Sequence, residues 1–324
     1  MLWPICQLPR AEIYRDAVKE QDVKRESDLM SDSKNHDEPT SDKNTGFFDM
    51  LDRVQRDARH WLHDFRDCLA FFSRIPVATL FGPVSDGLPD FERASRTLPL
   101  VGLLLGLLSL VPATLFDAIA LTAPLPPMLL AGLTLAAMAL LTGGLHEDGL
   151  ADMADGFGGG HTIERKIEIM KDSRLGSFGA LALLFSVLIR FSILSYLFEN
   201  YGVWTGGVAF LASSMVSRVP MLHVWYTLPA ARLHGLSSVA GQPTTSSYGI
   251  GVAFAAIVTG CLIVPYFGLV AALSAFVGVV CASGYMVWLS KRHIRGQTGD
   301  VLGGSQQIGE IAFGVGLLLL ASAG

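Results

Sequence analysis

Acidic side chains are concentrated in one short part of this sequence, between residues 142 and 176. Seven carboxylates fall within 26 positions: Glu147, Asp148, Asp152, Asp155, Glu164, Glu168 and Asp172. Carboxylates gathered so closely repel one another unless a cation lies among them. The segment therefore predicts a divalent cation site, and with it phosphate chemistry. Two of the seven, Glu164 and Glu168, have lysines close by in the sequence, and we interpret them as surface charges.

The spacing of the other carboxylates predicts a metal-binding helix. Asp148, Asp152 and Asp155 are spaced i, i+4, i+7, which places them on one helix face within about 40° of each other. Anionic oxygen ligands suit Mg²⁺ or Mn²⁺ better than zinc. We predict that these three residues bind the metal, with Glu147 as a further ligand or as the general base. His146 is predicted to orient a carboxylate or to contact substrate.

Groups suited to phosphate oxygens follow the acidic positions. Glycines flank the predicted helix, including Gly158 and Gly159, and glycine lets the backbone approach a ligand closely. Lys171, Ser173 and Arg174 then supply cationic and hydroxyl donors. Together with the carboxylates they predict metal-assisted phosphoryl transfer, in which Lys171 and Arg174 stabilise the leaving phosphate.

The elements that must position these residues are membrane helices. A helix that crosses the hydrocarbon core needs about 20 mostly apolar residues. Seven stretches of the sequence qualify, roughly 98–121, 125–145, 178–198, 203–225, 249–268, 270–289 and 306–323. We predict an all-α fold, a polytopic bundle of about seven transmembrane helices in a lipid bilayer. Residues 67–82, interrupted by Arg74 and Pro76, predict a re-entrant or interfacial element before them.

The charge distribution divides the chain into two parts. Residues 1–66 hold 25 of its 53 Lys, Arg, Asp and Glu residues. We predict a polar extension there, disordered to about residue 46, with an amphipathic helix over 47–66. Residues 67–324 are predicted to form the integral membrane catalytic domain. The four cysteines form no CxxC or Cys/His pair, so neither disulfides nor zinc are indicated, and a net charge of -5 does not favour a nucleic-acid partner.

The positions of Lys and Arg predict the orientation in the membrane. The basic segments are the N-terminal part through Arg96, the 146–177 loop and the 290–297 loop. Even numbers of predicted spans separate them, so all three lie on one side. The positive-inside rule makes that side cytoplasmic. The acidic segment is therefore predicted to face the cytoplasm.

A second polar cluster lies at the cytoplasmic start of the last predicted span and comprises Thr298, Gly299, Asp300, Gln306 and Glu310. Asp300 and Glu310 either complete the metal or nucleotide site or are ordinary polar residues of a helix end. Arg190 and Arg218 fall inside predicted spans, where a charge is costly and usually marks a pathway or a buried partner. They are predicted to pair with the acidic cluster or to bind a substrate phosphate.

The motifs themselves resemble those of a known family. HEDGLADMADGFGGG, followed by ERKIEIMKDSRLGSFGALAL, closely resembles the signature of the cobalamin synthase (adenosylcobinamide-GDP ribazoletransferase) family. FFSRIPV at 71–77, RTLPLVGLLLG at 96–106 and GQTGDVLGGSQQIGE at 296–310 fit that family too. The resemblance covers about residues 67–324, so the N-terminal extension has no assigned role.

The resemblance implies a transferase of cobalamin (vitamin B12) biosynthesis in the bacterial inner membrane. It implies that adenosylcobinamide-GDP is joined to α-ribazole or its 5′-phosphate, that GMP is released and that Mg²⁺ is the cofactor. His146, Gly158, Gly159, Ser173, Arg218, Thr298, Asp300, Gln306 and Glu310 are then the candidate substrate contacts. A homo-oligomer remains open.

Two other functions share features with this sequence. A CDP-alcohol phosphotransferase also uses clustered aspartates in membrane helices, and Asp152-Met-Ala-Asp155-Gly156 resembles the opening of its motif. The chain lacks the later Arg and the closing D-x3-D of that motif. An ion-coupled transporter would place acidic residues near the membrane midplane, whereas here they lie at the end of a span and in a loop.

Overall fold

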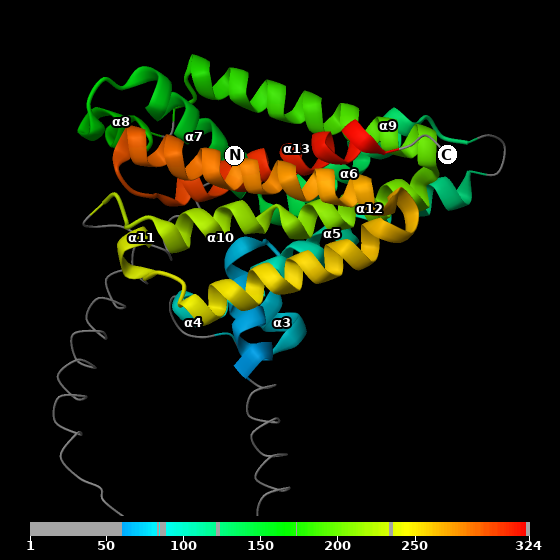
Figure 1. Cartoon of the computed structure of the whole chain (residues 1–324), viewed down its shortest axis with the longest axis horizontal. Helices are drawn as coiled ribbons and strands as arrows, with labels where there is room; N and C mark the ends of the chain where they lie inside the picture. Colours follow the sequence, from blue (N-terminus) through cyan, green and yellow to red (C-terminus); the bar gives the residue numbers. More distant parts are fainter. Residues whose placement is uncertain are drawn as a thin grey trace, which may run out of the picture.

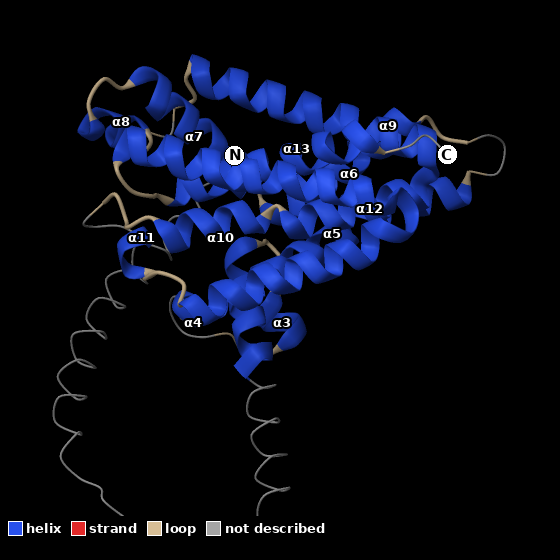
Figure 2. Ribbon diagram, viewed as in Figure 1, coloured by secondary structure: helices blue, strands red, loops and turns tan. Residues whose placement is uncertain are grey.

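The structure is a computed structural model that describes residues 60–82, 84, 89–120, 124–172, 174–232 and 236–321. Over these ranges the chain consists of helices and the loops between them, with one isolated bridge between Ala230 and Gln297 in place of any strand (Figure 2). The prediction of an all-α fold is confirmed. Residues 60–72 are helical, while the rest of the predicted N-terminal extension lies outside the described ranges.

Long helices make up most of the molecule, and short ones connect them. The long helices are α5 (Leu98–Ile119), α6 (Pro127–Thr142), α7 (Leu145–Gly159), α9 (Ser177–Val216), α10 (Arg218–Thr227), α12 (Thr245–Ile294) and α13 (Gly299–Leu320). The short ones are α3 (Val77–Phe81), α4 (Phe91–Ala94), the 3₁₀ helix η2 (Ser95–Thr97), α8 (Ile163–Ile169) and α11 (Leu236–Val239). In Figure 1 the helical segments of α9, α10, α12 and α13 lie roughly along the long axis of the molecule.

Two of the long helices are folded back on themselves at a glycine. Gly202 in α9 has φ 76° and ψ 164°, and Gly268 in α12 has φ 79° and ψ 165°. Residues other than glycine rarely adopt such a backbone conformation. In Figure 1 the chain reverses direction within α12, where the colour changes from yellow to orange. It also reverses within α9, so that the green first part of α9 and the following α10 run in opposite directions. A straight 50-residue helix would be about 75 Å long, more than twice the hydrocarbon thickness.

The count of membrane spans differs from the sequence prediction. Three helical stretches are long and apolar enough to cross a membrane, namely Phe91–Ile119, Ser177–Thr227 and Thr245–Ile294. The pair α6 and α7, bent by 85°, would make a fourth if it counts as one span. Two of the three stretches each contain two of the seven predicted spans, joined at Gly202 or Gly268. The predicted span at 306–323 falls on α13, which is outside the three stretches and carries Gln306, Gln307 and Glu310.

A sharp turn between α6 and α7 sets the direction of the acidic helix. Gly143 and Gly144 both adopt the left-handed conformation, with φ 67° and 70°, and so end α6 and begin α7. The Arg74 backbone N–H donates to the Leu141 carbonyl at 2.7 Å, and the Arg74 side chain packs over Gly143. The segment predicted as re-entrant or interfacial therefore packs at this turn. Its contacts help to hold α7 at a wide angle to α6.

Candidate active site

Close packing of two helices brings the acidic helix beside the second polar cluster. A Cβ placed on Gly149 of α7 would lie 2.9 Å from the Asp300 carbonyl oxygen and 3.2 Å from the Gly303 Cα of α13. No larger residue fits there without a shift of one backbone. The first turn of α13 thus lies directly against α7. The structure brings Asp300 to the acidic residues, as the sequence predicted in one of its two interpretations.

Three carboxylates form an outer group at this contact: Asp148, Asp152 and Asp300. Asp148 is exposed, and the other two are partly buried. Asp152 lies on α7, outside the three long apolar stretches. Burial raises the pKa of its carboxyl group to about 7, and the negative charges of Asp148 and Asp300 act in the same direction. One cation is in contact: Arg232 Nη2 lies 3.2 Å from Asp300 Oδ2.

The outer group has the ligand chemistry of a magnesium site without a complete set of protein ligands. Among the described residues, no three His, Cys, Asp or Glu side chains are placed so that they could hold a metal ion together. Burial is the main reason that the pKa of Asp152 is raised, and a bound cation would relieve the repulsion from Asp148 and Asp300 that adds to it. Mg²⁺ commonly takes one or two protein carboxylates and completes its shell with water and substrate phosphate. The residues present fit that pattern.

Asp155 has a different role from the one predicted. Its two oxygens accept hydrogen bonds from the backbone N–H groups of Gly176, at 2.7 Å, and Gly179, at 2.8 Å. Gly176 is the N-cap position of α9, so the carboxylate satisfies unpaired donors at the positive end of that helix. The side chain is buried, with 8% exposed. Asp155 thus fastens α9 to α7, whereas Asp148 and Asp152 make no such bond.

Glu147 belongs to an inner group that faces the interior of the bundle. Its Oε1 accepts from Arg190 Nη2 at 3.1 Å and from Gln307 Nε2 at 3.1 Å. Its Oε2 is buried and has no hydrogen-bond partner in the structure. Successive residues of α7, Glu147 and Asp148, therefore point to different environments, which agrees with the 100° that separates neighbouring positions on a helix.

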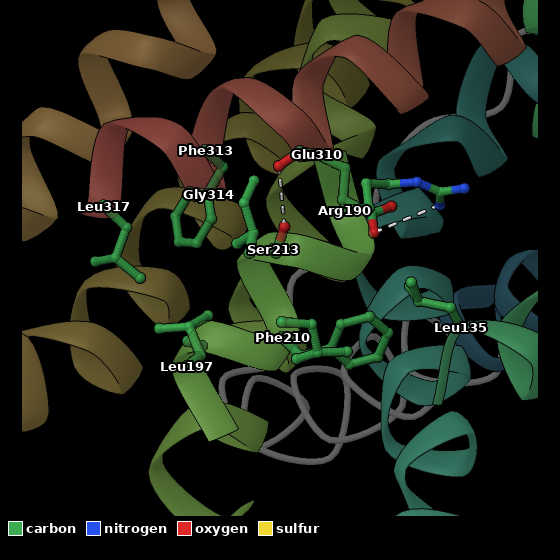
Figure 3. Close-up of a pocket in the computed structure, with 12 residues that line it drawn as sticks. Leu135, Arg190, Leu197, Phe210, Ser213, Glu310, Phe313, Gly314 and Leu317 are labelled. Carbon is green, nitrogen blue, oxygen red and sulfur yellow. Dashed lines mark hydrogen bonds and ion pairs between the residues drawn. The ribbon is translucent and has the colours of Figure 1, made fainter. Parts of the chain in front are cut away.

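The inner group continues across α13. Arg190 Nη1 lies 3.6 Å from Glu310 Oε1 (Figure 3). Gln306 Nε2 donates to Glu310 Oε2 at 2.8 Å and to Ser217 Oγ at 3.0 Å. Arg218 Nη1 donates to the same Ser217 oxygen at 3.0 Å. Glu310, Gln306 and Arg218, all predicted as substrate contacts, are at most 5% exposed and are bonded to the protein itself.

A small cavity lies beside the inner group. Figure 3 shows Arg190, Ser213 and Glu310 at its polar part, with apolar residues such as Leu197, Phe210 and Leu317 around the rest. Its volume is about 30 Å³, which is room for roughly two water molecules. A nucleotide or a corrinoid does not fit there. The cavity is part of the packing of α9 and α13, and the outer carboxylates are the accessible part of the site.

The predicted phosphate-binding residues do not join the carboxylates. Arg174 is 87% exposed and pairs with Asp172 at 2.6 Å, and its hydrogen bonds lower the pKa of Asp172. Lys171 is exposed as well, and Ser173 lies outside the described residues. The prediction for Glu168 is confirmed, because it pairs with Arg165 on the exposed surface of α8.

The glycines after the acidic positions pack against side chains of this chain rather than against open space. α7 continues to Gly159, so the predicted glycine-rich turn is its last helical turn. A Cβ on Gly158 would lie 2.6 Å from the Phe178 ring, and one on Gly156 would overlap Met170. Gly159 alone has no contact shorter than 3.5 Å. Gly156 and Gly158 thus let α8 and α9 approach α7, while the predicted substrate contacts of Gly158 and Gly159 stay a prediction.

Two other predicted residues hold the site in place. Thr298 is the N-cap of α13; its Oγ1 accepts from the Val301 N–H at 3.3 Å and donates to Asp300 Oδ2 at 3.2 Å. His146 is 3% exposed, stacks on Phe72 with ring centroids 6.4 Å apart, and is not accessible to a substrate in this structure.

Sequence reasoning missed two residues of the site. Arg232 lies in a loop with no motif around it, and only the fold brings it to Asp300. Gln307 follows Gln306 in the sequence, and nothing in the sequence pattern indicates that Gln307 contacts Glu147. Arg190 was identified as a costly intramembrane charge, and its pairing with the acidic cluster, one of two alternatives, is what the structure contains.

Comparison with known proteins assigns the chain to a family. Residues 64–318 match the family described as cobalamin-5-phosphate synthase. The chain belongs to this family. The match takes in α7, nearly all of α13 and every residue of the outer and inner groups, and it confirms the resemblance seen in the motifs.

Curated relatives of this family cover most of the chain. A protein of Azorhizobium caulinodans is 43% identical over 262 residues, which is 80% of this chain and 97% of the relative. A protein of Sinorhizobium medicae is 40% identical, over 81% of this chain and 98% of the relative. A protein of Brucella ovis is 39% identical, over 78% of this chain and 94% of the relative. All three are named adenosylcobinamide-GDP ribazoletransferase. No solved structure matches the chain.

Proposed function

We propose that this protein joins adenosylcobinamide-GDP to α-ribazole, or to α-ribazole 5′-phosphate, and releases GMP. The name shared by relatives about 40% identical over nearly their whole length supports this activity. The single structural observation that carries it is the contact of α7 with α13, which gathers Asp148, Asp152 and Asp300 at an accessible surface. Because the chain belongs to the cobalamin-5-phosphate synthase family, we propose neither a CDP-alcohol phosphotransferase nor a transporter.

In the proposed reaction the ribazole hydroxyl oxygen attacks the cobinamide-linked phosphorus. A new P–O bond forms there, the bond to the GMP oxygen breaks, and the hydroxyl proton must be removed. Glu147 is our candidate to accept that proton through a water molecule bonded to its Oε2, because that oxygen is buried and has no protein partner. Its other oxygen, Oε1, contacts Arg190 Nη2 at 3.1 Å. Arg232, beside Asp300, is placed to contact a substrate phosphate.

We further propose that Mg²⁺ binds at the outer group through one or two of the carboxylates of Asp148, Asp152 and Asp300, with water and substrate phosphate completing its shell. These oxygens fit a hard divalent cation, and their mutual repulsion is relieved by one. When bound, Mg²⁺ would neutralise charge on the diphosphate. Asp155 is left out of this set because both of its oxygens are bonded to the start of α9. Lys171 and Arg174 lie on the exposed segment before α9, where they remain candidates for contacts with the leaving phosphate.

The proposed membrane arrangement has seven crossings. Breaks at Gly202 and Gly268 divide two long stretches into four segments of a length suited to one crossing each. α5, α6 and α13 supply the other three. Large apolar side chains stand exposed on the long helices, as expected for a lipid-facing surface, for example Leu107, Leu184 and Val277. We propose the bacterial inner membrane, with α7 and the start of α13 facing the cytoplasm by the positive-inside rule.

The proposal is tested by omitting one substrate at a time. The purified full chain in detergent or lipid should release GMP from adenosylcobinamide-GDP only when α-ribazole or its 5′-phosphate is present. A corrinoid product that contains the ribazole should form in equal amount. Release of GMP without α-ribazole would indicate a hydrolase, and no release with both substrates would remove the proposed function.

A further inference from the structure

Arg190 is the cation that connects the acidic helix with the interior of the bundle. It lies in the first half of α9, inside one of the apolar stretches, and is 6% exposed. An arginine in such a place is costly unless its charge is matched. Its two partners are Glu147 at 3.1 Å, through Nη2, and Glu310 at 3.6 Å, through Nη1. One guanidinium therefore contacts α7, through Glu147, and α13, through Glu310, at the same time; Figure 3 shows the contact with Glu310.

The geometry of the guanidinium gives this contact a directional effect. Its nitrogens form a rigid planar fork, so two carboxylates bound to it are fixed relative to each other. Gln307 of α13 donates to the same oxygen of Glu147 that Arg190 contacts. Oε1 is thus held by two donors from two helices. Oε2, on the other side of the carboxylate, is left without a protein partner.

The charges of the inner group are balanced. Glu147 and Glu310 are opposed by Arg190 and by Arg218, which is 3% exposed. Arg218 donates to the Ser214 carbonyl and to Ser217 Oγ, and it reaches Glu310 only through Ser217 and Gln306. The charge balance of the group can therefore be separated from the orientation of Glu147. A variant that removes one positive and one negative charge keeps the charge balance but loses the contact that orients Glu147.

We propose that Arg190 is a positioning residue for the transfer reaction, which fixes the orientation of Glu147 and the first turn of α7 through its fork to Glu147 and Glu310. This inference rests on the proposed function. Arg190 does not touch substrate in this arrangement and acts through Glu147. Substitution of Arg190 is accordingly expected to lower kcat with little effect on KM.

The decisive variant is the double substitution Arg190→Gln with Glu310→Gln, which leaves Glu147 and Arg218 as a balanced pair. We expect it to accumulate in membranes and to melt near the wild-type temperature. Its kcat for GMP release should fall about 10–100-fold, the usual effect of losing a partner that orients a functional ligand, while KM changes by less than about threefold. Wild-type kcat in a folded double variant would overturn the proposal.

Single substitutions separate charge from geometry. Arg190→Lys keeps a positive charge but has no fork, so its kcat should lie between those of Arg190→Gln and the wild type. Equal kcat in Arg190→Lys and the wild type would contradict a role for the fork. Arg165→Gln is the matched control, because it removes an arginine from an exposed pair with Glu168 and should leave kcat unchanged.

Hydrogen exchange supplies a measurement that does not depend on turnover. In the double variant the backbone amides of residues 145–150 should exchange faster than in the wild type, while those of α5 are unchanged. Unchanged exchange at 145–150 would overturn the positioning role. If the wild type itself releases no GMP, the proposed function fails, and the exchange result still decides whether Arg190 positions α7.

Discussion

At the scale of single residues, neighbouring carboxylates of one helix have different partners. Asp148 and Asp152 face Asp300, Glu147 faces Arg190, and Asp155 bonds to the start of α9. The sequence predicted the helix and the acidic face correctly. It did not separate Asp155 from the others, because the donors at Gly176 and Gly179 reach it only after α9 packs on α7. The sequence did not predict the ion pair of Arg174 with Asp172, and the predicted contact of Arg174 with the leaving phosphate stays a proposal.

Asp152→Asn is expected to reduce the rate of GMP release at least a hundredfold, because it removes a negative charge from the proposed magnesium site. The variant should still fold, since the substitution relieves repulsion from Asp148 and Asp300. Rates measured at saturating Mg²⁺, with the yield of membrane protein as a folding check, test this. Near-normal activity would remove Asp152 from the ligand set.

Asp155→Ala is expected to act on stability first. It leaves two backbone N–H groups at the start of α9 without partners, at a cost of about 0.5–2 kcal/mol in the free energy of unfolding. A lower melting temperature with the Mg²⁺ dependence of the remaining activity unchanged is the expected result. An unchanged melting temperature combined with a raised Mg²⁺ requirement would instead identify Asp155 as a metal ligand.

At the scale of elements, glycines determine how the helices meet. Apolar length predicted where helices lie, and the predicted segments 98–121 and 125–145 correspond to α5 and α6. The sharp turn into α7 was not predicted, although Gly143 and Gly144 stood in the sequence. A glycine permits a left-handed conformation without requiring it. Its use depends on packing partners, here Arg74 and Leu141, that a pattern does not reveal.

Gly149→Ala is expected to move α13 away from α7 and so to separate Asp300 from Asp152. The added Cβ would lie 2.9 Å from a backbone oxygen, which cannot rotate away. We expect kcat to fall at least tenfold, measured as GMP release. Gly284→Ala is the control, because a Cβ there meets nothing within 4 Å. Equal activity of the two variants would show that the α7–α13 contact tolerates a shift.

At the scale of the whole molecule, the chain is a bundle whose polar chemistry is placed at one helix contact. Hydropathy located the apolar segments, and Lys and Arg positions predicted their sidedness. The number of crossings did not follow from either. Two of the three stretches that are long and apolar enough to span a membrane each consist of two helices joined at a break, at Gly202 or Gly268. Seven crossings are therefore a proposal with its own test.

That test uses cysteines added near the breaks and near the site. A cysteine at position 200 or 269, beside the breaks, is expected to react with a membrane-impermeant thiol reagent added to the periplasmic side, whereas one at 174 should react only after the membrane is opened. Both Asn200 and Leu269 are exposed, and their substitution leaves the glycines of the breaks in place. Substitutions are made in a chain whose native cysteines have been replaced. Labelling of positions 174 and 200 from the same side would contradict the proposed arrangement.

The most direct test of the central claim is the dependence of GMP release on a divalent cation. The wild-type chain is assayed with adenosylcobinamide-GDP and α-ribazole after treatment with a chelator, and Mg²⁺ is then added back in steps. The proposed function predicts no release after chelation and full recovery with Mg²⁺. Release that is undiminished by the chelator would contradict a metal-assisted transfer at Asp148, Asp152 and Asp300.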